Sequence, residues 1–244
     1  MLMGLLQPED APMNGQENDV LDEQLAYYRA RAPEYNDWYY RRGRYELPPE
    51  RRQQWFAELE ILERALYELP PITDALELAG GTGIWTEKLA QVCNSVLVLD
   101  ASEEMIAISS SRVGQNNVGY RQQDLFDWQP SEKYDLVFAA FWLSHIPPSR
   151  LAAFLSATRK AMAISGKVFF TDGLHNPNSV ANDHQLEEPG SLLQLRKLND
   201  GRQFHVVKVF YDPRQLVAEC RRAGIQLTMR TTGDFFWYGI GELL

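Results

Sequence analysis

Three side chains could act directly on a small substrate: His145, Lys208 and Arg196. His145 ends the segment Phe141–His145, which follows an apolar run expected to be a buried strand. Imidazole exchanges a proton near neutral pH, so His145 could serve as a general base for an acceptor that must lose a proton. The alternative is a neutral histidine that is hydrogen-bonded within the loop at residues 142–147.

Lys208 interrupts an otherwise apolar face. In an expected strand at residues 204–211, a period of two places Lys208 on the same face as Phe204, Val206 and Phe210. Burying an ammonium group without an anion is costly. The pattern therefore indicates either an edge strand whose lysine extends to water or an ammonium group directed at an anionic substrate. Arg196 and Arg202 are close enough in sequence to complete such a site.

A glycine-rich turn can present backbone N–H groups to a ligand. The run Glu77–Gly83 reads Glu-Leu-Ala-Gly-Gly-Thr-Gly and joins a short apolar strand to a helix expected over residues 84–92. A strand, a glycine turn and a helix N-terminus form a common site for a nucleotide or another polar ligand. The dinucleotide pattern would require glycine at position 86, where this chain has Thr86, and this argues against a nicotinamide or flavin cofactor.

Two further acids follow predicted strands. Asp100 ends the strand expected at residues 95–99 and lies 23 residues after Glu77, where a carboxylate can accept hydrogen bonds from ribose hydroxyls. Asp124 and Leu125 follow a strand expected at residues 118–122. The carboxyl ends of parallel strands share one edge of the sheet, so these residues and the glycine turn should meet there.

Together these motifs resemble class I S-adenosylmethionine (SAM) dependent methyltransferases. The resemblance implies SAM as cofactor and S-adenosylhomocysteine (SAH) as product. It places Met105 and Leu125 against the adenine ring and Asp124 near its amino group, with Ala79 where the family often has glycine. The implied cofactor contacts are Tyr28, Tyr35, Glu77, Ala79, Gly80, Gly81, Gly83, Asp100, Met105, Asp124, Leu125 and Phe141.

A segment dense in tyrosine and arginine, residues 27–45, precedes the glycine motif. Its aromatic side chains could simply pack on the main domain while its arginines remain solvated. Alternatively, it resembles the Tyr-rich N-terminal arm that covers the cofactor in several small-molecule methyltransferases. Tyr28 and Tyr35 match that arm best, and spacing alone does not identify which tyrosine contacts SAM.

A narrower resemblance is to phosphonate O-methyltransferases of the kind found in dehydrophos biosynthesis. It is carried by the runs at residues 25–32, 121–128, 141–147 and 200–210, and it spans about residues 25–224. It implies that Arg196 and Lys208 hold an acidic oxygen group near the methyl donor. The stretch 39–71 is longer and more Arg-rich than in that group, so the substrate remains open.

Composition narrows the class of substrate. The chain has 244 residues, a net charge of −9 and a pI near 5.0, which argues against a nucleic-acid substrate. No segment has the apolar length of a membrane helix or a signal peptide, so we expect a cytoplasmic protein. Cys93 and Cys220 are too few and too isolated for a disulfide framework or a metal site. A small-molecule substrate and a monomer or homodimer are expected.

The predicted fold class is α/β. We expect a Rossmann-like, doubly wound seven-stranded sheet with an antiparallel last strand, an N-terminal helical lid, and a small cap insertion after strand five. The expected divisions are a disordered head at 1–18, a lid at 19–71, and a methyltransferase domain at 72–244 with the insertion at about 173–203. Within the insertion, residues 191–199 are expected to be helical.

The predicted activity is methyl transfer from SAM to a small molecule, at an oxygen of a phosphonate or carboxylate. One alternative is an N-, C- or phenol O-methyltransferase that uses His145 as its base. The other is a SAM-binding protein that transfers no methyl group. Asp172 and His175 are weaker candidates for the base.

Overall fold

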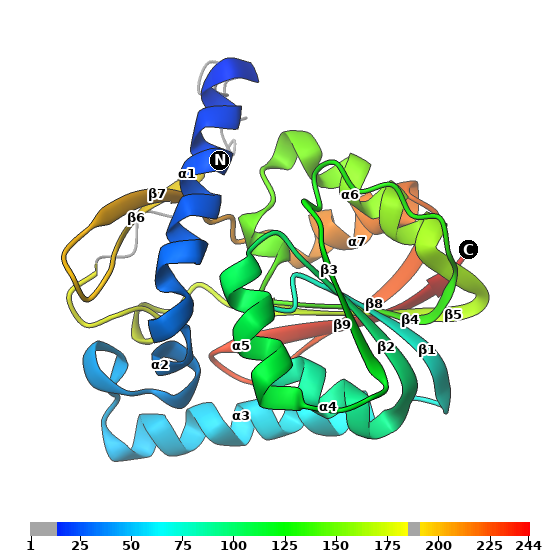
Figure 1. Ribbon diagram of the computed structural model, residues 1–244, viewed down its shortest axis with the longest axis horizontal. Helices are drawn as coiled ribbons and strands as arrows, with labels where there is room; N and C mark the ends of the chain where they lie inside the picture. The colour runs from blue at the N-terminus through cyan, green and yellow to red at the C-terminus, as the bar shows by residue number, and fades with distance from the viewer. Residues whose placement is uncertain (1–13, 185–190) are drawn as a thin grey trace, which may run out of the picture.

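The computed structural model describes residues 14–184 and 191–244 and is built around a seven-stranded sheet (Figure 1). The strand order is β3-β2-β1-β4-β5-β9-β8, and β9 runs antiparallel to both of its neighbours. This confirms the predicted sheet and its antiparallel last strand. The strands are β1 Ile72–Leu78, β2 Cys93–Asp100, β3 Val118–Gln122, β4 Tyr134–Ala140, β5 Met162–Gly173, β8 Ile225–Thr231 and β9 Phe236–Leu243.

Helices cover both faces of the sheet, because its central strands are apolar on both sides. In β4, Leu136 and Phe138 face a core that includes side chains of α3 and α4, whereas Val137 and Ala139 face a core with side chains of α6 and α7. All four are fully buried. The five helices that flank the sheet are α3 Pro49–Tyr67, α4 Ile84–Val92, α5 Glu103–Val113, α6 Pro148–Ala161 and α7 Pro213–Arg222.

The N-terminal segment forms a helical arm. Its helices are α1 (Asn14–Arg31) and α2 (Tyr35–Tyr40), separated by a short 3-10 turn that contains Pro33, a residue that disfavours a helix interior. Of the head expected at 1–18, residues 1–13 lie outside the described residues and residues 14–18 belong to α1.

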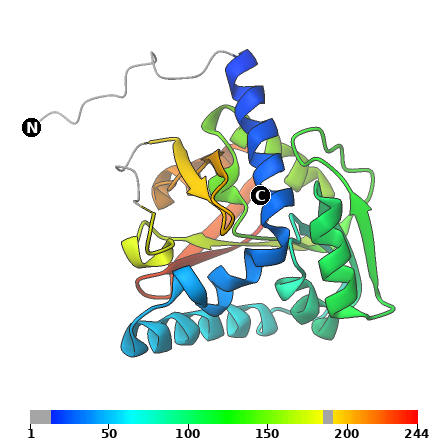
Figure 2. The ribbon, with the colours of Figure 1, turned by 60° about the vertical axis from the view of Figure 1, so that its left-hand side comes forward.

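The insertion after β5 forms a hairpin, so the helix expected at residues 191–199 was wrong. The strands β6 (Leu193–Lys197) and β7 (Gln203–Val207) pair antiparallel. The connection contains Asn199-Asp200-Gly201, and Gly201 has a φ of +93°, which suits a tight hairpin turn. Turn chemistry and strand pairing therefore outweigh the helix propensity of the leucines. Figure 2 shows this hairpin beside α1, away from the main sheet.

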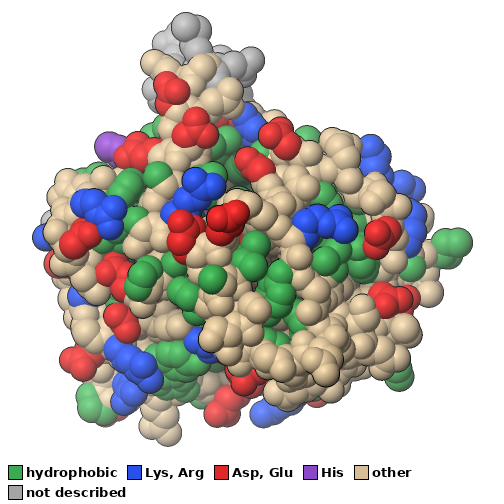
Figure 3. All heavy atoms as spheres, in the orientation of Figure 1, with side chains coloured by type: hydrophobic (Ala, Val, Ile, Leu, Met, Phe, Trp, Pro, Cys, Tyr) green, Lys and Arg blue, Asp and Glu red, His purple; other side chains and the backbone are tan. Residues whose placement is uncertain are grey.

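Charged side chains of both signs are interspersed on the face shown in Figure 3, with no continuous basic patch there. In the described ranges, no helix is long and apolar enough to cross a membrane. The same ranges contain no cluster of three or more His, Cys, Asp or Glu side chains suited to a metal ion.

Trp55 fixes α3, which supports the arm. It is fully buried, its ring centroid lies 4.6 Å from that of Phe236, and its Nε1 donates to the carbonyl oxygen of Tyr39 at 3.0 Å. We expect Trp55→Ala to lower the free energy of unfolding by about 3–5 kcal/mol, because it leaves a cavity and removes this hydrogen bond. Denaturant titration measures the change, with the exposed Gln53→Ala as control. Equal stability of the two variants would contradict this role.

Candidate functional site

The glycine turn after β1 is shaped by close packing. A Cβ at Gly80 would lie 2.3 Å from Cγ1 of Val98, and one at Gly83 would lie 2.5 Å from Oγ of Ser109. Gly81 has a φ of +56°, a conformation that favours glycine. The glycines therefore allow the turn to lie close to β2 and α5.

Two residues other than glycine share this left-handed conformation at the carboxyl ends of neighbouring strands. Ala79, after β1, has a φ of +55°, and Phe141, after β4, has a φ of +58°. Such conformations are costly for residues with a Cβ and concentrate at functional sites. Ala79 stands where the resemblance would often place glycine, and its backbone has a conformation that favours glycine.

A cavity of about 490 Å³ lies beside this turn, at the carboxyl ends of the strands. That volume is in the usual range for a small-molecule or cofactor site. Nine of the predicted cofactor residues line it: Tyr28, Tyr35, Ala79, Gly81, Asp100, Met105, Asp124, Leu125 and Phe141.

The lining of this large cavity suits a nucleoside that also carries a positive charge. Carboxylates of Asp22, Asp100, Asp124 and Asp127 surround it, and Arg150, the one lysine or arginine among the described lining residues, is paired with Glu17 on α1. Met105 and Leu125 add buried apolar surface, with 2% and 5% of their surface exposed. The lining thus offers acceptors for hydroxyl and amino groups together with apolar contacts for a ring.

Asp100 connects the turn to the next helix. Its Oδ2 accepts from the backbone N–H of Gly81 at 2.8 Å, and its Oδ1 accepts from that of Ser102 at 2.9 Å. Burial raises the pKa of Asp100, although these backbone hydrogen bonds oppose the rise. The carboxylate is therefore held in place at the wall of the large cavity.

The other three predicted cofactor residues, Glu77, Gly80 and Gly83, do not line the large cavity. Glu77 is 2% exposed, and its Oε2 accepts from Oγ1 of Thr86 at 2.6 Å. Burial raises the pKa of Glu77 to about 8. A direct contact of these three residues with the cofactor stays a prediction.

A second cavity, of about 60 Å³, adjoins the first. Tyr28, Tyr35, Phe141 and His145 line both cavities and therefore form the wall between them. The remaining side chains of the small cavity include both predicted cations, Lys208 and Arg196. The arm thus contributes to both cavities, as the predicted lid requires.

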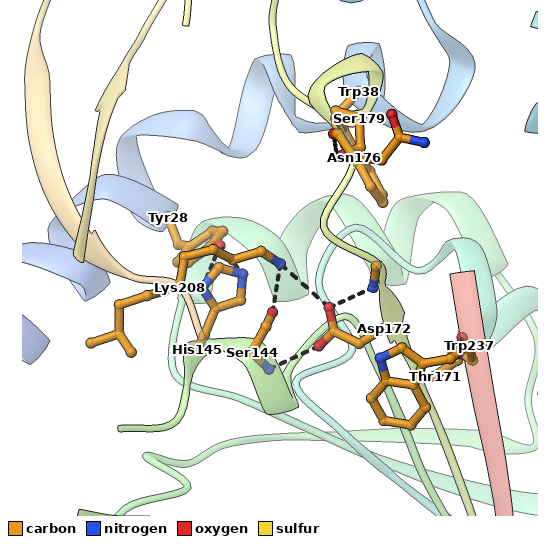
Figure 4. A network of polar contacts seen from close by, with 12 residues as sticks. Tyr28, Trp38, Ser144, His145, Thr171, Asp172, Asn176, Ser179, Lys208 and Trp237 are labelled. Carbon is orange, nitrogen blue, oxygen red and sulfur yellow. Dashed lines mark hydrogen bonds and ion pairs between the residues drawn. The ribbon is translucent and has the colours of Figure 1, made fainter. Parts of the chain in front are cut away.

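Lys208 is held in a polar network at the small cavity (Figure 4). Its Nζ donates to Oγ of Ser144 at 2.6 Å and lies 3.4 Å from Oδ1 of Asp172. The side chain is 13% exposed, so it does not extend to water as an edge-strand lysine would. Burial lowers the pKa of Lys208, and Asp172 opposes this shift. The strand expected at residues 204–211 is β7, which ends at Val207. Lys208 therefore lies one residue beyond the strand.

His145 is neutral and already hydrogen-bonded. Its Nδ1 lies 2.7 Å from the carbonyl oxygen of Val207 and therefore donates, which leaves Nε2 to accept from the hydroxyl of Tyr28 at 2.8 Å. Burial and the nearby charge of Lys208 hold the pKa of His145 well below its usual value. Both ring nitrogens of His145 are thus engaged in hydrogen bonds, and its role as a general base stays a prediction.

Some sequence expectations about this site were wrong and some residues were missed. Arg202 is exposed and pairs with Asp200, and His175 is exposed, so neither lines a cavity. Arg31 lines the small cavity and is only 8% exposed, which does not fit the alternative in which the arginines of residues 27–45 are solvated. Ser144 was missed because its contact with Lys208 joins segments 64 residues apart.

Known proteins share this fold. A methyltransferase-domain family matches residues 75–166. The structure of DhpI in complex with SAM and HEP is 36% identical, with a TM-score of 0.75, over 95% of this chain and 100% of that one. The DhpI–SAH complex gives the same identity and a TM-score of 0.72, over 93% and 98%.

Curated relatives match over shorter segments. Ubiquinone biosynthesis O-methyltransferase of Methylococcus capsulatus is 28% identical over 63% of each chain. Malonyl-[acyl-carrier protein] O-methyltransferase 2 of Ilyobacter polytropus is 32% identical over 28% of this chain and 27% of its own length. This chain thus spans less than two thirds of either relative. On the DhpI match, which covers nearly all of both chains, the chain belongs to the class I SAM-dependent methyltransferases.

Proposed function

We propose that this enzyme transfers a methyl group from SAM to an oxygen of a small anionic metabolite, a phosphonate or a carboxylate. The observation that carries the proposal is the contrast between two adjoining cavities. The large one is lined by carboxylates, and the small one is lined by Lys208, Arg196 and Arg31. The 36% identity to DhpI, whose structure was solved with SAM and HEP, supports the same assignment.

The large cavity would hold the cofactor. Asp100 would accept hydrogen bonds from the ribose hydroxyls, and Asp124 would lie near the adenine amino group. Met105 and Leu125 would contact the ring, while Tyr28 and Tyr35 of the arm would close the site over the reacting end. When bound, SAM supplies a sulfonium whose methyl group is electrophilic.

The chain's own residues would then contribute mainly position. Lys208 and Arg196 would hold the acceptor's charged oxygens, and the shared wall would direct one oxygen toward the large cavity. An ionised phosphonate or carboxylate oxygen needs no base before it attacks. The aromatic wall would also keep water from the reacting groups.

The geometry of His145 favours this proposal over a phenol, alcohol or amine acceptor. A general base needs a free lone pair and a pKa near the working pH. The Nε2 of His145 already accepts from Tyr28, and its pKa is lowered. A SAM-binding protein without transfer would also have no use for a cationic cavity beside the cofactor site.

We expect Asp100→Ala to weaken SAM binding ten- to a hundredfold, because a charge-assisted hydrogen bond contributes roughly 1.5–3 kcal/mol. Isothermal titration calorimetry with SAM and SAH measures the change, and NAD serves as the ligand that should not bind. Asp135→Ala is a matched control, since that carboxylate accepts from Thr73 and Asp74 and does not line the large cavity. Unchanged SAM affinity in the Asp100 variant would remove this residue from the site.

We expect Lys208→Met to preserve folding and SAM affinity but to lower kcat/KM for an anionic acceptor by about a hundredfold, on the order of 3 kcal/mol. Methionine retains the apolar stem while it deletes the charge. Arg196→Met should behave alike, and the double variant should be less than additive. Steady-state kinetics, with the exposed Lys197→Met as control, tests this. Full activity of the Lys208 variant on every accepted substrate would refute the anionic-acceptor proposal.

We expect His145→Asn to lower kcat by less than about tenfold, since loss of a true general base typically costs 10²–10⁴-fold. The remaining effect should come from a displaced Tyr28. The pH profile separates the two roles, because a structural histidine leaves the profile unchanged. A loss of a hundredfold or more, accompanied by disappearance of an ionisation from the wild-type profile, would assign the base role to His145.

A further inference from the structure

Arg31 is the least expected charge in the small cavity. Its guanidinium carbon lies 4.9 Å from the ring centroid of Tyr35, 5.5 Å from that of Tyr27 and 5.8 Å from that of Tyr45. Its one hydrogen bond to a described residue is long, from Nη2 to the hydroxyl of Tyr45 at 3.4 Å. Aromatic faces attract a cation only weakly compared with a carboxylate. The buried charge therefore lacks a strong partner within the described residues.

A second buried arginine on the same arm provides a contrast. Arg41 is 1% exposed, and its Nη2 and Nη1 donate to the carbonyl oxygens of Asn178 at 2.5 Å and Ser179 at 3.3 Å. Nε of each arginine lacks a partner in the described structure, so the difference lies at the terminal nitrogens. Arg41 lines neither cavity. Arg41 thus stabilises the fold, whereas Arg31 has terminal nitrogens available at a cavity.

The charges around the small cavity do not balance. Among the described residues that line it, the cations are Arg31, Arg196 and Lys208, and Asp172 is the one acidic side chain. Of the ion pairs formed by residues 14–184 and 191–244, that of Lys208 with Asp172 is the one that involves any of these cations. This leaves an excess of two positive charges.

The other titratable groups that face Arg31 do not offset this excess. Burial raises the pKa of Tyr27 and of Tyr28 and raises that of Tyr35 to about 12, so these phenols stay neutral. His145 is neutral for the reason given above. Removing two positive charges from water without counter-charge is costly, so the cavity is suited to a ligand with two negative charges.

We propose that Arg31 is a specificity-determining residue that makes the small cavity select a doubly charged oxyanion, such as a phosphonate dianion, over a carboxylate. The inference rests on the proposed function and narrows its substrate class. Lys208 and Arg196 alone would leave one excess charge beside Asp172, which a carboxylate could balance. Arg31 adds the second positive charge, and its guanidinium can donate two hydrogen bonds to the oxyanion.

The selection also has a consequence for turnover. Attack by one oxygen of the dianion forms an O–CH₃ bond, the S–CH₃ bond breaks, and its electron pair stays on sulfur. No proton moves, and the phosphonate becomes a singly charged methyl ester. Because the product carries one charge fewer, the same three cations hold it less tightly than they hold the substrate. Charge loss therefore favours release.

The test compares three ligands on the SAH complex of the full chain, at a pH where ethylphosphonate is doubly ionised. Its monomethyl ester is a monoanion larger than ethylphosphonate, and propionate is a monoanion smaller than ethylphosphonate. The comparison therefore distinguishes an effect of ligand charge from an effect of ligand size. Calorimetry should show ethylphosphonate binding at least tenfold more tightly than either monoanion. Equal affinity for ethylphosphonate and a monoanion would overturn the selection. No measurable binding of any of the three would instead count against the proposed function, and with it this inference.

Variants then assign the selection to Arg31. We expect Arg31→Met to bind ethylphosphonate at least tenfold more weakly, while propionate affinity changes by less than threefold. Arg31→Lys should recover part of the preference. Arg41→Met removes a buried arginine from the same arm and should keep the wild-type preference even if its Tm falls. If Arg31→Met folds and still prefers ethylphosphonate over propionate as the wild type does, the assignment is wrong. The assignment is also wrong if both Arg31 variants fail to fold and the wild type shows no preference between these ligands.

Discussion

The buried contact between Lys208 and Asp172 is the interaction on which the site depends. It joins the insertion after β5 to the carboxyl end of β5 itself, and Ser144 on the loop after β4 completes it. Asp172 is further fixed because its Oδ2 accepts from the backbone N–H of Ser144 at 2.8 Å. A buried ion pair of this kind contributes little net stability, yet loss of one partner leaves an uncompensated charge. Its value lies in placing a cation at the carboxyl ends of the strands, where the two cavities adjoin.

The arm is positioned against the same network. The side chain of Gln24 on α1 accepts from the backbone N–H of Val207 and donates to the carbonyl oxygen of His145. It therefore ties α1 to β7 and to the loop after β4. Tyr28, one turn later, reaches His145. A movement of α1 would therefore disturb both cavities at once. This coupling lets one short segment form part of the lining of both cavities.

The sequence predicted the sheet well, and it placed nine of the twelve candidate cofactor residues around one cavity, because these are local features. The turn at Gly80 and Gly81 and the acid at Asp100 each follow a strand, and parallel strands bring their carboxyl ends together. The residues lining the small cavity come from the arm, the loop after β4, the end of β5, the segment that follows it, and β9, and sequence spacing does not report such long-range contacts. Arg31 resembled a solvated helix residue, and the hairpin at residues 193–207 resembled a helix followed by a strand, because tertiary packing decides both.

The most direct test of this account is a crystal structure of the protein with SAH and ethylphosphonate. Under the proposed function, two opposite charges, the sulfonium of the donor and the acceptor's oxyanion, meet at the wall formed by Tyr28, Tyr35, Phe141 and His145. The account predicts phosphonate oxygens within hydrogen-bonding distance of Lys208, Arg196 and Arg31, with one oxygen directed at the sulfur of SAH. Ethylphosphonate bound elsewhere, with these three cations turned away from it, would contradict the account.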